Sequence, residues 1–243
     1  MKRCLTEGNK MNRSEYIEKV LQAYSLAGLM SRKNGCEVLH LKNKKSGTDL
    51  VLRSFPHSVA AYEKLQTIRH VNLPEIYDVL EMDDGQIVLE EYIDGLTVAQ
   101  VMEIDKYRPS GARKVLLGLC DALTVLHNLG IIHRDVKPEN VIVGKSGRVV
   151  LIDFNASRIE SRANKDTVIM GTVGYASPEQ LGLAQTDART DIYAIGVLYN
   201  VMLTGQHPSV TIAPRRAGRI VRKCTAVNPN ERYHTAIQLW TAL

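Results

Sequence analysis

The sequence predicts an α+β chain in two parts, a small, mainly β part over residues 1–91 and a larger, mainly helical part over residues 92–243. Short strand-forming runs separated by polar turns dominate the first part. Apolar residues recur at helical spacing in the second part, from Val98 onward. The 243 residues, 44% of them hydrophobic, are enough to bury a core, which argues against a disordered or fibrous chain.

Two helices are predicted in the N-terminal part. The first, Ser14–Ala23, forms an N-terminal extension, and the hydroxyl of Ser14 is a candidate N-cap. The second covers Ser58–Ile68. One face of the first helix carries its apolar side chains, Ile17, Val20, Leu21 and Tyr24.

Two strand hairpins account for the rest of the N-terminal part. The first joins Glu37–Leu41 to Asp49–Arg53, and the second joins Ile76–Glu81 to Gln86–Glu91 across the turn Asp83–Gly85. Strands of this length with polar turns favour an antiparallel arrangement.

The C-terminal part reads as helical because apolar residues recur at spacings of three and four. Its longest apolar run, Ile192–Leu203, has only about a dozen residues against the roughly 20 needed to span a bilayer, so we expect no membrane insertion in this segment. No signal-peptide core follows the first residues. The helical spacing is clearest at Val115, Leu116, Leu119, Leu123 and Leu126.

Cysteine usage and charge bear on the compartment and the partners. The four cysteines are far apart and form no CxxC pair, which favours free thiols and a cytoplasmic location. The net charge is +5, with a basic cluster over Arg215–Lys223. Because this cluster lacks interleaved aromatics and fits an amphipathic helix burying Ile220, Val221 and Cys224, we expect no nucleic-acid partner.

The strongest chemical signal is the stretch His133–Asn140, followed by Asp153 after a short apolar strand. Asp135 offers a carboxylate to an attacking hydroxyl, and Lys137 offers a cation to a travelling phosphoryl group. The oxygens of Asn140 and Asp153 are hard ligands suited to Mg²⁺ or Mn²⁺. The set indicates phosphoryl transfer.

These residues resemble a known family. His133–Asn140 is similar to the catalytic loop of eukaryotic-type protein kinases, and Asp153–Asn155 is similar to their DFG metal-binding motif with Asn in place of Gly. Gly171–Thr172 and Tyr175–Glu179 resemble the elements that end the activation segment and dock peptides. The phrasing around Ser177–Gln180 is most similar to bacterial serine/threonine kinases.

The resemblance implies the bilobal protein-kinase fold, with an N-lobe over 1–91, including the helical extension, and a C-lobe over 92–243. It implies catalytic roles for Asp135, Lys137, Asn140 and Asp153, with metal held by Asn140 and Asp153. ATP is expected between the lobes, below a hinge near residues 91–95. The expected nucleotide-binding residues are Arg53, Glu91, Ile93, Val38, Val51 and Lys137.

The resemblance also implies structural roles. Asp191 is expected to hold the backbone of the catalytic loop, and Thr172 to bond the catalytic aspartate and lysine. Glu179 should pair with Arg232. Asn155 tolerates a positive φ, so we expect it to keep the backbone kink of the glycine that it replaces.

The N-terminal part departs from the family. The stretch that corresponds to the glycine-rich loop, Leu29–Val38, keeps one glycine, Gly35. Either the backbone approaches the phosphates less closely, or side chains such as Ser31 and Lys33 substitute.

Arg53 stands where the family has a phosphate-binding lysine, and its planar fork is not equivalent to an ammonium. The glutamate that pairs with it is either Glu63, after a small shift in its helix, or Glu90, at the gatekeeper position. A carboxylate at position 90 would be costly to bury without a partner.

The expected activity is transfer of the γ-phosphoryl group of ATP to a protein serine or threonine. Thr167 is a candidate autophosphorylation site, with Arg134 as a partner for the phosphate. Two alternatives stay open. A pseudokinase would sense nucleotide or bind a partner with weak or no transfer, and a kinase of this fold could act on a small molecule, although the Ser-Pro-Glu segment favours a peptide.

Overall fold

The computed structural model describes residues 12–160, 172, 174–181 and 185–243. These form two compact units: one runs to Ile68 and resumes from Glu75 to Tyr92, and the other comprises Arg69–Pro74 and Ile93–Leu243. Residues 69–74 belong to the C-terminal unit because they bond to one of its strands. The side chain of Asn72 donates to the Val149 carbonyl at 2.7 Å, and the Leu151 amide donates to the Asn72 carbonyl at 3.0 Å.

The N-terminal unit is built on an antiparallel sheet of five strands in the order β1-β2-β3-β5-β4. Both predicted hairpins are confirmed, as β2 with β3 and β4 with β5. The edge strand β1 was not predicted, because most of its residues are exposed and no polar–apolar alternation marks it. The strands are β1 (Tyr24–Lys33), β2 (Cys36–Asn43), β3 (Asp49–Phe55), β4 (Ile76–Met82) and β5 (Gly85–Glu91).

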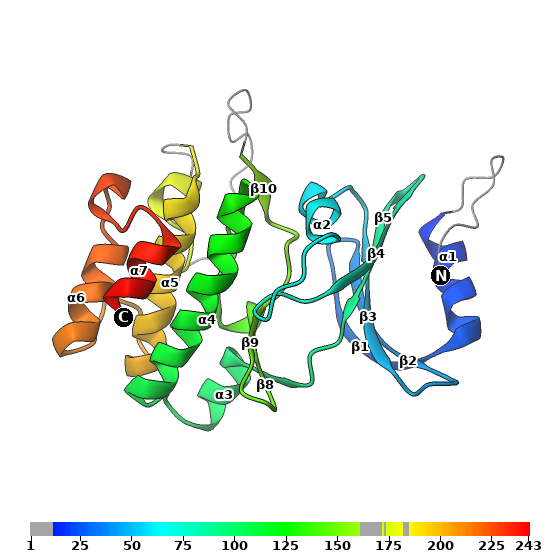
Figure 1. Ribbon diagram of the computed structural model, residues 1–243, viewed down its shortest axis with the longest axis horizontal. Coiled ribbons are helices and arrows are strands. Elements are labelled where there is room, and N and C mark those ends of the chain that lie inside the picture. Colours follow the sequence, from blue (N-terminus) through cyan, green and yellow to red (C-terminus); the bar gives the residue numbers. More distant parts are fainter. Residues whose placement is uncertain (1–11, 161–171, 173, 182–184) are drawn as a thin grey trace. The chain divides into compact units, whose positions relative to one another are not determined.

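The strand register divides the side chains of this sheet between two faces. One face carries Leu39, Leu41, Leu50, Leu52 and Ile87, and helix α1 (Arg13–Ala23) packs on it through its apolar side. The opposite face carries the alternate residues of β2, β3 and β5 and the helix α2 (Ala60–Leu65), whose Tyr62 ring lies 5.5 Å from the ring of Phe55. Figure 1 shows α1 and α2 on opposite sides of the sheet.

The bounds of both helices of this unit differ in part from the prediction: α1 begins one residue earlier and ends at Ala23 as predicted, and α2 is shorter. The helix of the extension is confirmed, but its N-cap is Asn12 and not Ser14. The Asn12 side chain accepts a bond from the Glu15 amide, and a Glu15 carboxylate oxygen accepts one from the Asn12 amide, so this capping box satisfies two amide donors that the helix itself leaves unpaired. The second helix is limited to Ala60–Leu65, shorter than the predicted Ser58–Ile68.

The C-terminal unit is mainly helical, as predicted (Figure 1). The longest helices, α4 and α5, contribute many of its buried side chains, and α6 buries Ile220, Val221 and Cys224 while exposing its arginines. No helix in the described ranges has the length and apolar character that crossing a membrane requires. The helices are α3 (Val98–Ile104), α4 (Pro109–Asn128), α5 (Ala188–Thr204), α6 (Arg215–Cys224) and α7 (Ala236–Ala242).

Short strands and 3₁₀ turns carry the connections of this unit, and apart from the apolar run Val149–Ile152 they were not predicted. One small sheet has the order β6-β8-β9, and β7 pairs with β10. The strands are β6 (Gly95–Thr97), β7 (Ile131–Ile132), β8 (Val141–Gly144), β9 (Val149–Leu151) and β10 (Arg158–Ile159), and the 3₁₀ turns are η1 (Pro138–Asn140), η2 (Pro178–Leu181) and η3 (Pro229–Glu231).

Candidate active site

The hairpin of β8 and β9 brings the two predicted metal ligands together. Val141, the first residue of β8, pairs with Leu151, the last of β9, so Asn140 and Asp153 lie at the same end of the hairpin. The amide of Ile152 donates to the carbonyl of Asn140 at 2.9 Å and closes that end. Asn140 and Asp153 are 13 positions apart in the sequence. They lie at the same end because the turn between the antiparallel strands β8 and β9 reverses the chain.

The Asp135 carboxylate is the centre of a compact polar network. Lys137 Nζ lies 2.7 Å from one carboxylate oxygen, and the hydroxyl of Thr172 donates to the other at 2.6 Å. Lys137 Nζ also donates to the Thr172 hydroxyl at 2.8 Å, as the family resemblance predicted. Asn140 Nδ2 donates at 2.9 Å both to the carboxylate and to the carbonyl of Asp135. These contacts join three of the four predicted catalytic residues.

The network keeps Asp135 ionised. Burial raises the pKa of the Asp135 carboxyl, but the hydrogen bonds from Lys137 and Thr172 outweigh burial and hold the pKa below its ordinary value. At neutral pH the group is therefore an anion that can accept a hydrogen bond from an alcohol.

Asp191, at the start of α5, holds the backbone of the loop that carries Asp135. Its fully buried carboxylate accepts bonds from the amides of His133, at 3.0 Å, and Arg134, at 2.8 Å. His127 Nε2, from α4, lies 2.8 Å from the same carboxylate. Burial alone would raise the pKa of Asp191, but the His127 contact and the His133 amide hold it low. The predicted role of Asp191 is confirmed.

The Asp153 backbone has a left-handed conformation, with a φ of 67°. We expected the positive φ two residues later, at Asn155, where the family has glycine; that expectation was wrong, because no positive φ occurs at Asn155. Aspartate and asparagine are the non-glycine residues that adopt this conformation most readily.

Nearby, the buried His133 lies edge-on to the Phe154 ring at 5.4 Å, and its Nε2 is 3.2 Å from the Ile152 carbonyl. His133 is thus a packed scaffold residue.

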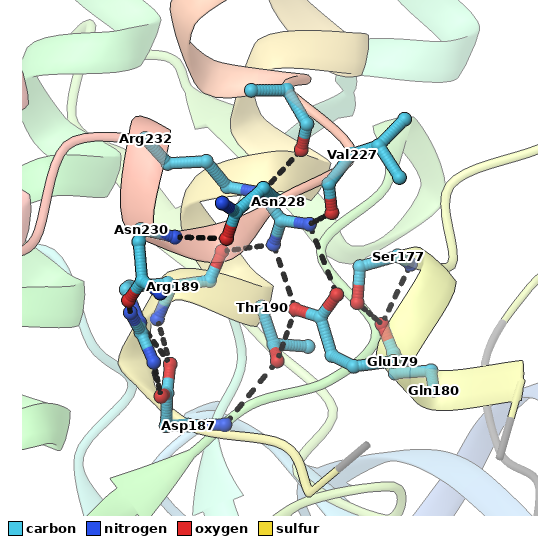
Figure 2. Close-up of polar contacts among 11 residues, drawn as sticks. Ser177, Glu179, Gln180, Asp187, Arg189, Thr190, Val227, Asn228, Asn230 and Arg232 are labelled. Atoms are coloured by element: carbon cyan, nitrogen blue, oxygen red, sulfur yellow. Dashed lines mark hydrogen bonds and ion pairs between the residues drawn. The ribbon is translucent and has the colours of Figure 1, made fainter. Parts of the chain in front are cut away.

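Glu179 and Arg232 form a buried ion pair in the same unit. Figure 2 shows the two guanidinium nitrogens facing the two carboxylate oxygens, at 2.7 and 3.0 Å. Thr190 adds a bond to Glu179 at 3.0 Å. The neighbouring Gln180 donates to the Arg134 carbonyl at 2.8 Å, which ties this segment to the loop that carries Asp135. The predicted pair is confirmed.

In the N-terminal unit, Arg53 is paired with Glu90. Arg53 Nε donates to a Glu90 oxygen at 2.6 Å, and the two side chains are only 7% and 2% exposed. Glu63, the other candidate, lies exposed on α2. The Glu90 carboxylate is thus buried together with an opposite charge, which offsets the free energy that its burial alone would cost.

The remaining predicted nucleotide-binding residues fall in both units. Val38 and Val51 lie on the same face of the sheet as Arg53, since Val38 is directly opposite Arg53 in the β2–β3 register and Val51 is two residues away along β3. Glu91 ends β5, where its carboxylate accepts a bond from the Glu75 amide at 3.1 Å. Ile93 belongs to the C-terminal unit and packs with Ile142 and Val150.

The stretch predicted to correspond to a glycine-rich loop is a tight hairpin. Lys33 pairs with Cys36, and the residues between them, Asn34 and Gly35, have φ values of 51° and 76°. Positive φ at both central positions defines a type I′ turn, for which Asn-Gly is the preferred sequence. That dipeptide was the signal for this hairpin, and the sequence reasoning did not use it.

An antiparallel sheet followed by a mainly helical region is the protein kinase fold. Residues 40–239 match the family model of the protein kinase domain. The chain therefore belongs to the protein kinase domain family.

Its relatives are distant bacterial serine/threonine-protein kinases. The protein named serine/threonine-protein kinase PknB of Mycolicibacterium smegmatis is 31% identical over 204 residues, which cover 71% of this chain and 33% of that protein. The probable serine/threonine-protein kinase PknB of Lactococcus lactis is 31% identical over 199 residues, covering 78% and 31%. The chain spans about a third of the length of these relatives.

Two predicted features lie outside the described residues, namely the candidate phosphorylation site Thr167 and Gly171. Within the described ranges, no three side chains of the His, Cys, Asp and Glu types gather as a metal cluster. A magnesium site of the type predicted here needs fewer than three protein side chains, because phosphate oxygens and water complete the coordination of that ion.

Proposed function

We propose that this domain transfers the γ-phosphoryl group of ATP to a serine or threonine hydroxyl of a protein. The observation that carries the proposal is the Asp135 carboxylate held between Lys137, Thr172 and Asn140. A scaffold has no chemical need for an ionised carboxylate arranged in this way, with a second acidic residue, Asp153, at the end of the hairpin that carries Asn140.

Asp135 would orient the substrate hydroxyl. Its lowered pKa makes it a weak base, so it accepts the proton only as the oxygen–phosphorus bond forms and the hydroxyl becomes acidic. The bond between the γ-phosphorus and the oxygen that bridges it to the β-phosphate breaks, and ADP leaves with that oxygen. Catalysis is then mainly positioning and charge stabilisation.

Lys137 would neutralise the moving phosphoryl group, and its bond to Thr172 fixes the ammonium beside Asp135. Asn140 and Asp153 would hold Mg²⁺ or Mn²⁺. They fit, because the amide nitrogen of Asn140 is bound to Asp135, which directs its amide oxygen away from that carboxylate, and because Asp153 lies at the same end of the hairpin. When bound, such an ion draws negative charge from the phosphate oxygens.

For the nucleotide we propose the contacts that the family resemblance implies. Val38 and Val51 would contact the base, with the backbone of Glu91 and Ile93 as hydrogen-bonding groups. Arg53 would contact the α- and β-phosphates, with Lys137 at the γ-phosphate. The proposed acceptor is a protein, and autophosphorylation near Thr167 is part of the proposal.

One observation favours a second candidate. Arg53 replaces the lysine expected of an active kinase, and it is committed to Glu90. A nucleotide-sensing or protein-interaction module with weak or no transfer would tolerate that change.

Labelled ATP distinguishes the two functions. The purified chain is incubated with ATP labelled at the γ-phosphate and Mg²⁺, alongside Asp135→Asn, Asp153→Asn and a control, Asp121→Asn. Asp121 is an exposed aspartate of α4. We expect wild type and the control to label themselves or a generic protein, and both site variants to lose at least about 100-fold in rate.

The other outcomes count against an enzyme. Nucleotide binding without label transfer would support the sensor, and the absence of both binding and transfer would support a scaffold. Equal label on wild type and Asp135→Asn would remove Asp135 from the mechanism.

A further inference from the structure

A triphosphate requires positive charge, and the buried cation of the N-terminal unit is already neutralised. Arg53 and Glu90 are bonded at 2.6 Å, so together they contribute no net charge. The other basic side chains along this face of the sheet include His40 and Lys42 on β2, and both contact Asp49, at 2.7 and 3.7 Å. The face that carries Val38 and Val51 therefore needs a further cation to hold phosphate.

Lys33 is placed on that face by the strand register. It is directly opposite Cys36, and Cys36 and Val38 point to the same side because alternate residues of a strand share a face. Arg32, one position earlier, points to the other side, where it forms an ion pair with Glu37. The alternation therefore assigns one basic residue of the hairpin to each face.

The hairpin tip that carries Lys33 is held from the opposite side. The Asn34–Gly35 turn shapes it, and Arg13, the first residue of α1, donates to the Gly35 carbonyl at 3.4 Å. Arg13 also donates to the Ser54 hydroxyl at 3.1 Å and pairs with Asp84 at 3.2 Å. A tip anchored to a helix and to a second loop has a fixed backbone, so less backbone entropy is lost when a side chain of the tip binds a ligand.

Lys33 itself is exposed, and among the described residues no acidic side chain pairs with it. We propose that Lys33 binds phosphate oxygens of the nucleotide and supplies the positive charge that the Arg53–Glu90 pair does not. This inference rests on the proposed ATP binding. On this proposal the side chain of Lys33, and not the backbone amides of the β1–β2 turn, binds the phosphate. This agrees with the single glycine in that stretch of the sequence.

The test compares ligands that differ only in phosphate. The affinities of ATP, ADP and adenosine are measured by titration calorimetry for wild type, Lys33→Ala and Lys33→Arg. The control is Lys19→Ala, which removes an exposed lysine from α1. We expect Lys33→Ala to weaken ATP and ADP binding by about 10-fold or more while adenosine binding is unchanged, because charge-assisted bonds of this kind have that magnitude. Lys33→Arg should retain most of the affinity, and Lys19→Ala all of it.

Two results would overturn the inference. One is an ATP affinity of Lys33→Ala equal to that of wild type, and the other is an equal loss for adenosine, which would indicate a structural effect. If wild type binds no ATP, the proposed function itself fails. If wild type binds ATP and Lys33→Ala binds it equally well, only the inference about Lys33 fails. Equal thermal unfolding temperatures for wild type and Lys33→Ala will show that the variant is folded.

Discussion

The buried ion pair between Glu179 and Arg232 is a residue-level contact with a large expected effect on stability. Arg232 is 1% exposed and makes bonds to Glu179 and to three carbonyls, those of Ala226, Val227 and Arg189. Removing one partner leaves a buried charge without compensation, which is far more costly than losing an exposed pair.

We therefore expect Glu179→Gln to lower the free energy of unfolding at pH 7 by about 3–5 kcal/mol. The pKa of Glu179 is held below its ordinary value, because the bonds from Arg232 outweigh the effect of burial. A lowered pKa stabilises the fold above the unfolded-state pKa of about 4.3, and this contribution is lost as the pH falls. Urea unfolding over a range of pH should show the difference between wild type and variant shrinking below that value.

Glu231→Gln is the matched control, because Glu231 is the exposed neighbour of Arg232. Its effect should stay within about 0.5 kcal/mol. A stability loss that is the same for both variants, or that does not change with pH, would contradict the assigned role of Glu179.

At the level of elements, the packing of α5 against α6 depends on a glycine. A Cβ built at Gly196, in the middle of α5, would lie 2.3 Å from the Cβ of Cys224 and 3.1 Å from a methyl carbon of Thr225. Cys224 is fully buried, so neither helix can move without disturbing the core. Helix propensity favours alanine over glycine here by about 1 kcal/mol, and the packing opposes it.

We expect the packing to prevail, so that Gly196→Ala destabilises the protein by about 1–3 kcal/mol in chemical unfolding. Gly111→Ala in α4 is the comparison, since its added Cβ would meet its nearest neighbour, Tyr107, at an ordinary 3.4 Å. That variant should be neutral or slightly stabilised. Equal stability of the two variants would show that α6 yields to the added methyl group.

The element α1 shows how pattern and partner combine. Its apolar face was predicted from spacing alone, and the structure identifies what that face covers, namely the leucine side of the sheet. A helical period shows which side chains need burial, whereas the surface that buries them depends on residues as distant as Ile87. β1 was missed for a different reason, because most of its residues are exposed and no alternation marks them.

Considered as a whole molecule, the chain combines a conventional C-terminal unit with an unusual start. The family match begins at residue 40 and so excludes α1, β1 and the Asn34–Gly35 turn. The glycine-poor turn and Lys33 lie there, whereas Arg53 and Asn155, which also depart from the family pattern, lie within the matched residues.

Removal of metal tests the whole activity. We expect label transfer to stop in excess EDTA and to return when Mg²⁺ or Mn²⁺ is added, because Asn140 and Asp153 are proposed to act through such an ion. The circular dichroism spectrum should be the same in EDTA, because no metal cluster of the described side chains supports the fold. Transfer that persists without divalent ions would contradict the metal role of these two residues.

The sequence by itself determined the two-part α+β organisation, both predicted hairpins, the helical C-terminal part and the order of Asp135, Lys137, Asn140 and Asp153, because periodicity and local spacing encode these features. Only the tertiary structure decided that Glu90 is the partner of Arg53 and that Asp153, not Asn155, has the positive φ. Each of these depends on the three-dimensional path of the backbone, and the choice between two partners far apart in the chain follows from which strands are neighbours in the sheet.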